Sequence, residues 1–185
     1  KFHLPKAAKR SGLTQALGSA MNDPVLLDES WLRHEKHFPV GGDIKLQILT
    51  GQLLVEQLLR EIFTMQLRFP EALKGESGAS FDSHEMICLV QAISPHSDKE
   101  VWVWDAAKRL NRVRNQLAHQ LEPAALDEKI NSLLKFVRNA PPIKPSLERL
   151  GLPEGKEIEA IVLAVCGCLT SLKLYLAHIG PPSTA

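Results

Sequence analysis

The sequence has few of the residues that would announce a specialised fold or a bound cofactor. Its 185 residues include only three cysteines and one tyrosine, and the formal net charge is +1. Cys88, Cys166 and Cys168 are an odd number without a CxxC pair, which argues against a disulfide framework or a zinc cluster and favours reduced thiols. Because the net charge is so small, only a local cluster of cations could bind a nucleic acid.

No stretch of the sequence predicts a membrane span or a targeting segment. The most apolar run, Ala160–Leu172, has 13 residues and follows Glu157 and Glu159. A bilayer requires about 20 residues, so we expect a buried or interface helix and a cytoplasmic protein. The first twenty residues lack the apolar run of a signal peptide. Because the chain opens on Lys1, we expect its numbering to begin within a longer chain.

Apolar residues recur at intervals of three and four along most of the chain, which predicts an all-α protein. We expect helices over residues 22–38, 43–67, 80–93, 100–121, 126–137 and 155–178, with Asn22-Asp23-Pro24, Asp43, and Ser80 or Asp82 marking starts. The predicted fold is an up-and-down bundle of about five to six helices. It comprises an N-terminal arm (1–21), the bundle (22–139), a proline-rich connector (140–154), a C-terminal helix (155–179) on the bundle or at a dimer interface, and a tail (180–185).

The expected fourth helix carries the most distinctive chemistry in the sequence. Its segment Ala106–Leu121 has no carboxylate, and a histidine, His119, follows an arginine, Arg114, by five residues. The cations of the segment are Lys108, Arg109, Arg112 and Arg114. Guanidinium groups, two amides and a side chain that titrates near neutrality are the groups needed to handle a phosphodiester.

The helical register separates these groups around the axis. At 100° per residue the buried stripe centres on Leu110 and Leu117. We expect the opposite side to carry Lys108, Asn111, Arg112, Asn115, His119 and Glu122. Arg114 lies beside the buried stripe, roughly 140° from His119. These two side chains could therefore meet at one phosphate only in a groove that wraps the helix, or if a second copy contributes in a symmetric dimer.

The string Arg114-Asn115-Gln116-Leu117-Ala118-His119 resembles the R-x4–6-H motif of the HEPN family, in which a polar residue commonly follows the arginine. The resemblance covers about Val40–Val137 and includes the helical setting of the motif. It implies a metal-independent endoribonuclease without a cofactor, working as a homodimer whose two motifs line one cleft. It also implies a toxin or antiviral-defence effector, with a minimal nucleotidyltransferase as a candidate antitoxin partner.

The same resemblance implies roles for individual residues. Arg114 would stabilise negative charge in the transition state, and His119 would act as general acid or base in the attack of the ribose 2′-hydroxyl. Asn115 would orient the phosphate or the imidazole. The products would be a 2′,3′-cyclic phosphate and a 5′-hydroxyl. No tyrosine closely follows His119, which argues against the subgroup with an H-x-Y extension. We expect RNA to contact Lys108, Arg109, Asn111 and Arg112.

Several residues have plainer interpretations beside the functional ones. Glu56, on the expected second helix, could pair with Arg60 one turn later, or position the site from behind through Arg112 or Arg114. His119 could be a histidine near a helix C-terminus with no catalytic role. His34 and His37 are spaced like metal ligands, but without a second ligand pair we expect them on the surface.

Two other functions therefore stay open beside the ribonuclease. One is a non-catalytic module that holds RNA, a nucleotide or a protein in the same cleft. The other is a structural interaction protein in which the C-terminal helix mediates assembly and the motif is incidental.

Overall fold

The structure, a computed structural model, describes residues 28–74, 78–95, 97–98, 101–119, 126–139 and 156–180, and only the backbone of Trp31 and His119. Within these ranges every regular element is a helix, which confirms the all-α prediction for them. The elements are α2 (Glu29–His37), α3 (Ile44–Gln66), η2 (Pro70–Leu73), α4 (Ser83–Ile93), α5 (Val101–His119), α6 (Leu126–Asn139) and α8 (Glu157–Ile179). The predicted arm (1–21), helix start (22–27) and connector (140–154), and the tail beyond residue 180, lie outside the described residues.

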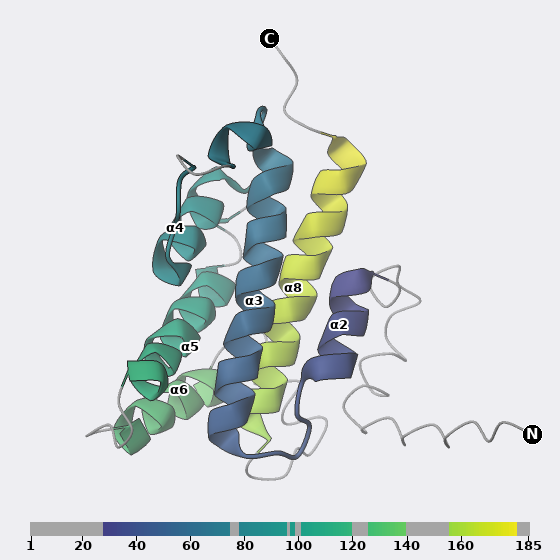
Figure 1. Cartoon of the computed structure of the whole chain (residues 1–185). Helices are drawn as coiled ribbons and strands as arrows, with labels where there is room; N and C mark the ends of the chain where they lie inside the picture. The colour runs from purple at the N-terminus through teal and green to yellow at the C-terminus, as the bar shows by residue number, and fades with distance from the viewer. Residues whose placement is uncertain are drawn as a thin grey trace, which may run out of the picture.

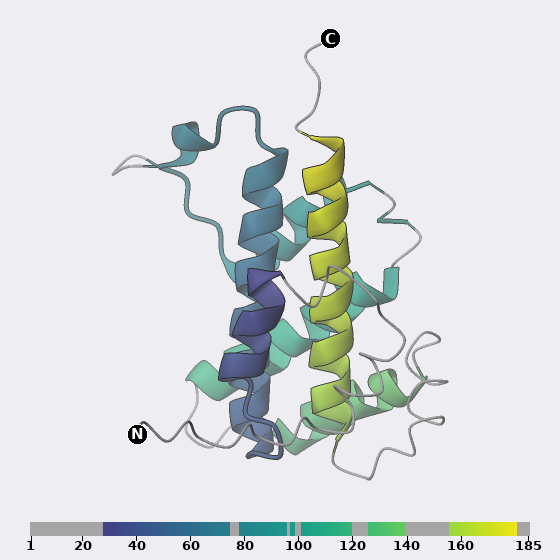
Figure 2. The same ribbon diagram turned by 90° about the vertical axis from the view of Figure 1, so that its right-hand side faces the viewer.

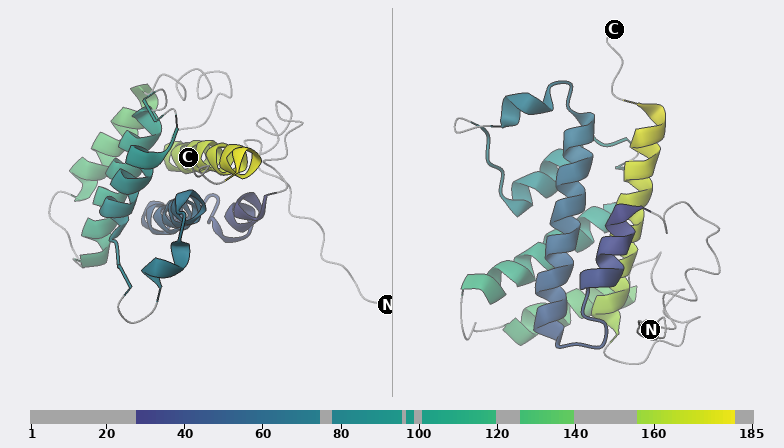
Figure 3. Two further views of the ribbon diagram at one scale, coloured as in Figure 1. Left: turned by 90° about the horizontal axis from the view of Figure 1, so that it is seen from above. Right: turned by 45° about the vertical axis from the view of Figure 1, so that its right-hand side comes forward.

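The helices lie in two layers (Figure 1). One layer contains α2, α3 and α8, and the other contains α4, α5 and α6, as the view from above in Figure 3 shows. Helices α3 and α8 lie side by side and run in the same direction, while α5 and α6 cross behind them obliquely (Figure 2). The arrangement therefore departs from the simple up-and-down bundle that was predicted, because the neighbouring helices α3 and α8 are parallel and α5 and α6 cross them obliquely.

Aspartates begin the first three described α-helices. Asp43 Oδ1 accepts hydrogen bonds from the backbone N–H groups of Lys45 and Leu46, at 2.9 and 3.1 Å. Asp82 and Glu85 form a reciprocal capping box at the start of α4. Asp28 caps α2 through Ser30. These bonds satisfy N–H groups that have no partner within the helix, so each cap fixes where its helix begins.

Helices α3 and α8 form the centre of the core. Ile48, Val55 and Ile62 of α3 and Ile161 and Val165 of α8 are fully buried. The two backbones approach closely at Gly51, where an added Cβ would lie 2.5 Å from Val162 Cγ2. A side chain at this position would collide with α8, so the glycine sets the distance between the two helices.

A buried carboxylate fixes the first turn of α8. Glu159 Oε1 accepts hydrogen bonds from the backbone N–H of Gly41 at 2.6 Å, from Gln47 Nε2 at 3.0 Å and from Lys156 Nζ at 2.8 Å. Gly41 has φ = +70°, a conformation that favours glycine. The contacts join α8 to the turn between α2 and α3, so this turn and the distant helix hold each other in place.

Helix α8 is long and apolar enough to cross a membrane by length and composition alone. It has 23 residues, and its most apolar window has a mean hydropathy of 2.0. The helix extends beyond the apolar run Ala160–Leu172 at both ends, and its bounds agree with the predicted helix over 155–178 to within two residues. Half of that window is buried within the fold, against α3, α5, α6 and α2. This burial explains the apolar composition as that of a core helix.

Candidate functional site

Arg114 lies on the side of α5 that faces the rest of the fold. It follows the buried Leu110 by four residues, so the two share one face of the helix. The side chain is half-buried, and its Nη1 donates a hydrogen bond to Asn115 Oδ1 at 3.0 Å. The amide of Asn115 therefore orients the guanidinium of its neighbour, a partner other than the phosphate or imidazole that the resemblance implied.

Glu56 of α3 lies close enough to Arg114 for the two charges to interact across the helix pair. Its carboxylate accepts hydrogen bonds from Arg60 Nη2 at 2.7 Å and from Ser83 Oγ at the start of α4. Partial burial acts to raise the pKa of Glu56, but the hydrogen bonds from Ser83 and Arg60 and the charges of Arg60 and Arg114 lower it overall. Glu56 therefore stays ionised, and its field favours the nearby guanidinium.

Of the two partners considered for Glu56, Arg60 on the same helix or an arginine of α5, the structure shows an ion pair with Arg60. Arg60 forms the ion pair one turn along α3, as predicted. No ion pair joins Glu56 to Arg112 or Arg114 within the described residues. Arg114 acts on Glu56 only through its charge, so the cross-helix relation is electrostatic and not a hydrogen bond.

His119 is the last residue of α5, and its side chain lies outside the described residues. Its backbone position still fixes its register. Five residues separate it from Arg114, which is roughly 140° around an ideal helix. The two residues therefore leave α5 in different directions.

Two of the four expected RNA contacts take part in the packing of α5. Lys108 Nζ donates to Gln91 Oε1 of α4 at 2.7 Å. The guanidinium carbon of Arg109 lies 4.7 Å from the centre of the Phe136 ring on α6, a cation–π contact. Both side chains are only half-buried, so each retains a solvent-accessible part. Arg112 is exposed, as the register predicted.

The prediction that Asn111 faces solvent is wrong. Its exposed fraction is 3%, and its Oδ1 has no hydrogen-bond partner among the described residues. Asn111 follows the buried Ala107 by four residues and the buried Trp104 by seven. Since α5 packs against α3, α4, α6 and α8, its buried face is wider than the single stripe read from the sequence. Asn111 is therefore not an RNA contact in this fold.

A small hollow lies between α5 and α6. Its volume is about 40 Å³, and it is lined by Arg109, Arg112, Val113, Lys129, Ser132 and Leu133. Sequence reasoning identified the two arginines but missed Lys129 and Ser132. These two residues lie on α6, and the sequence alone does not reveal that α6 packs against α5. Their three-residue spacing does predict that they share one face of α6.

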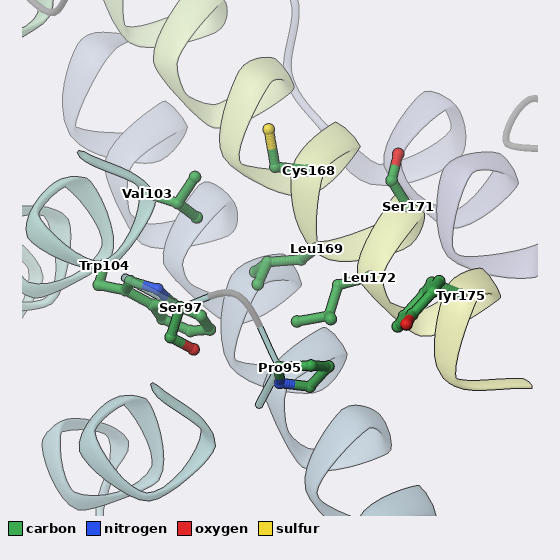
Figure 4. Close-up of a pocket in the computed structure, with 9 residues that line it drawn as sticks. All are labelled: Pro95, Ser97, Val103, Trp104, Cys168, Leu169, Ser171, Leu172 and Tyr175. Carbon is green, nitrogen blue, oxygen red and sulfur yellow. The ribbon is translucent and has the colours of Figure 1, made fainter. Parts of the chain in front are cut away.

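A larger hollow of about 290 Å³ lies between the first turns of α5 and the second half of α8 (Figure 4). Trp104, Leu169 and Leu172 converge on it, with Tyr175 at one end. The lining is mostly apolar, and none of the residues expected to act on RNA belongs to it. The two hollows therefore differ in chemistry, and only the smaller one adjoins the cationic segment.

The histidines of α2 do not form a metal site with their neighbours. Across the described ranges, no three His, Cys, Asp or Glu side chains are grouped to hold a metal ion. His34 is buried, contrary to expectation, because α2 packs on both α3 and α8. Its ring stacks on Phe38 with 5.0 Å between the centroids, and burial lowers its pKa to about 4.

The sequence matches no known protein-family model, no curated protein and no solved structure. The resemblance to the HEPN motif therefore has only the six-residue string and its helical setting behind it.

Proposed function

We propose that this protein is a metal-independent, HEPN-like endoribonuclease in which Arg114 and His119 act on one RNA phosphodiester. The observation that carries the proposal is the setting of Arg114. Arg114 is half-buried, and its guanidinium is oriented by Asn115 and interacts with the charge of the ionised Glu56, yet it forms no ion pair with that carboxylate. Arg60 and Ser83 already bond the carboxylate, so most donors of Arg114 stay available to a ligand.

Such a cation suits the transition state of RNA cleavage. When the 2′-hydroxyl attacks phosphorus, negative charge grows on the non-bridging oxygens of a five-coordinate intermediate. A fixed guanidinium with free N–H groups can bond two of these oxygens without having to reorganise. The negative charge of Glu56 favours the guanidinium of Arg114 nearby. Because Arg60 and Ser83 already bond the Glu56 carboxylate, it does not compete with the phosphate for the N–H groups of Arg114.

His119 supplies the proton transfers in this proposal. As a general base it takes the proton of the 2′-hydroxyl while the oxygen attacks phosphorus, and the bond to the 5′-oxygen breaks. The protonated imidazole then gives a proton to the departing 5′-oxygen, which leaves a 2′,3′-cyclic phosphate and a 5′-hydroxyl. An imidazole can both accept and donate a proton near neutral pH, because its ordinary pKa lies in that range.

A homodimer is part of the proposal because Arg114 and His119 diverge on one helix. Helix α3 carries two half-exposed leucines, Leu46 and Leu53, with exposed fractions of 50% and 56%. They are seven residues apart and share one face, and Leu53 is only three residues from Glu56. Pairing of two copies through this face would bury the leucines and bring a second α5 towards the first site.

The decisive experiment is cleavage of single-stranded RNA in the presence of EDTA. We expect cleavage by the wild-type chain, and its loss in Arg114→Ala and in His119→Ala while circular dichroism still reports a folded helical protein. Arg68→Ala and His84→Ala remove exposed side chains of the same types outside α5 and should cleave normally. Product ends that are 3′-hydroxyls, or cleavage that survives in both α5 variants, would contradict the assigned roles.

The cellular role proposed with this activity is that of a cytoplasmic toxin or defence effector restrained by an antitoxin such as a minimal nucleotidyltransferase. Expression should then slow growth, and Arg114→Ala should relieve the effect. A neutral effect of the wild-type chain on growth would contradict the toxin role and leave the biochemical activity to be judged by the cleavage assay.

The second candidate is a non-catalytic module that binds RNA or a nucleotide. The divergence of Arg114 and His119 around α5 favours it, since binding does not require the two groups to converge. An RNA that stays bound and intact over long incubation with the wild-type chain would support this function over the first.

A further inference from the structure

The hollow between α5 and α6 brings together positive charge from two helices. Arg109 and Arg112 of α5 and Lys129 of α6 line it, and the hydroxyl of Ser132 adds a neutral hydrogen-bonding group. None of the six lining residues is acidic. We call the set Arg109, Arg112, Lys129 and Ser132 the α5/α6 cationic groove.

Several other cations in the described part of the fold are paired with carboxylates, whereas those of this groove are not. Arg33, Arg60, Arg138, Lys156 and Lys173 each form an ion pair with a carboxylate. In the described ranges, Arg112 and Lys129 have no such partner, although Asp105 and Glu128 lie nearby along their own helices.

Arg109 is held without being neutralised. It lies over the Phe136 ring, a contact that fixes the guanidinium against α6 but leaves its charge uncompensated. Three like charges converging on one hollow repel one another, and an anion bound between them would remove this repulsion.

We infer that the α5/α6 cationic groove binds the phosphate backbone of a single-stranded RNA. The volume of about 40 Å³ is far below that of a pocket for an organic ligand, and it suits a single phosphate group with the strand continuing outside. Arginines match phosphate oxygens bidentately, and a serine hydroxyl can complete the contact. Because phosphates are common to all nucleotides, the groove positions the strand and does not read its sequence.

The choice of RNA as the strand rests on the proposed function, because the register of α5 connects the groove with the candidate active site. Arg112 and His119 are seven residues apart, so they lie almost on one line along α5. At 1.5 Å per residue the two positions are about 10 Å apart along the helix. A strand whose phosphate occupies the groove could therefore extend along α5 to its last turn, one or two nucleotides away.

Binding can be measured separately from cleavage with a 2′-O-methyl RNA, which lacks the attacking hydroxyl. A fluorescently labelled 12-nucleotide 2′-O-methyl oligouridylate is titrated with the full chain, and anisotropy is followed from 50 to 300 mM salt. We expect Arg112→Gln and Lys129→Gln each to weaken binding about eightfold at 50 mM salt. Each should also reduce the slope of log K against log salt by about 0.7. Lys135→Gln removes an exposed lysine of α6 outside the groove and should change binding less than twofold.

The inference is overturned if Arg112→Gln and Lys129→Gln bind as tightly as Lys135→Gln, with an unchanged salt slope and an unchanged melting temperature. Its failure can be told apart from failure of the nuclease. Cleavage that depends on Arg114 but keeps its KM in both groove variants would leave the proposed function standing and remove the groove. Tight binding that depends on the groove, with no cleavage of ordinary RNA, would leave the groove standing and remove the proposed nuclease.

Discussion

His34 couples the stability of the fold to pH. It is 7% exposed and its pKa is lowered to about 4 by burial, whereas an unfolded histidine titrates near 6.5. The unfolded chain therefore binds this proton first as the pH falls. The stabilisation is complete above pH 6.5 and is lost between pH 6.5 and 4, by about 3 kcal/mol in total.

Urea unfolding at pH 7.0, 6.0, 5.0 and 4.5 would measure this dependence. In His34→Gln we expect a much flatter free energy of unfolding across the same range. His37→Gln serves as the control, because this neighbouring histidine is exposed and should leave the wild-type slope in place. A wild-type free energy that does not change between pH 7.0 and 4.5 would rule out a buried, neutral His34.

Single residues also show where the sequence is informative and where it is not. The Glu56–Arg60 pair was predictable because it depends only on spacing within one helix. Asn111 and His34 were both expected at the surface, and both are buried. Their burial depends on helices that are distant in sequence, and no local pattern records how many neighbours a helix has.

At the scale of the helices, alanine at two glycines, one on α3 and one on α8, should change the free energy of unfolding in opposite directions. Gly51→Ala would place a Cβ against Val162, whose β-branched side chain cannot rotate away within a helix. We expect a loss of about 2 kcal/mol, despite the better helix propensity of alanine. Gly167→Ala on α8 meets nothing within 4 Å and should stabilise by up to about 1 kcal/mol.

Chemical denaturation of the two variants checks the direction of each change. A double-mutant cycle adds a sharper test, because Gly51→Ala should be less destabilising in a Val162→Ala background. Equal effects of Gly51→Ala with and without Val162 would mean that the two helices are not in contact at this point.

A second prediction for α8 concerns the carboxylate at its first turn. Glu159→Ala would leave the N–H groups of Gly41 and Gln47 and the ammonium of Lys156 without their shared acceptor. We expect a loss of about 2–4 kcal/mol in the free energy of unfolding. Glu71→Ala removes an exposed ion pair with Lys74 and should change it by less than about 1 kcal/mol. Similar losses in both variants would argue against the buried network.

Helix positions were largely predictable, because caps and periodicity are local signals. The starts at Asp43 and Asp82 and the ends near Leu67 and Ile93 agree with the structure to within one or two residues. The short helix η2 was missed, since four residues around Pro70 are too few to show a period. The predicted C-terminal helix over 155–178 likewise agrees with α8 to within two residues at each end.

At the scale of the whole molecule, the proposed composite site predicts complementation between inactive subunits. Arg114→Ala and His119→Ala should each be inactive alone. When they are unfolded together and refolded as a mixture, half of the dimers should contain one of each and retain one intact site. We expect roughly a quarter of the wild-type cleavage to return.

Cleavage by the mixture is measured beside each variant alone, and light scattering reports the mass of the assembly. Leu53→Glu should dissociate the assembly and abolish the recovery, while Leu32→Glu is a control exposed leucine on α2. A monomeric wild-type chain, or a mixture as inactive as its components, would exclude a site shared between subunits.

The arrangement of the two layers could not be predicted from the sequence. Periodicity identified which residues of α3 and α8 are apolar, but it does not say that these helices are partners or that they run in the same direction. For the candidate site, the string Arg114–His119 was visible in the sequence. The neighbourhood of Glu56 and Arg114, and the meeting of Lys129 with Arg112, required the packing of α3 and α6 on α5.

The central position of α8 also has a consequence for the order of biosynthesis. Among the described helices it leaves the ribosome last, about ninety residues after α3, whose apolar side it covers. Until then the nascent chain exposes that side to chaperones and proteases. The rigid framework therefore forms only after nearly all of these residues have been translated, and for the ribonuclease proposed above this order would delay damage to the messenger that encodes it.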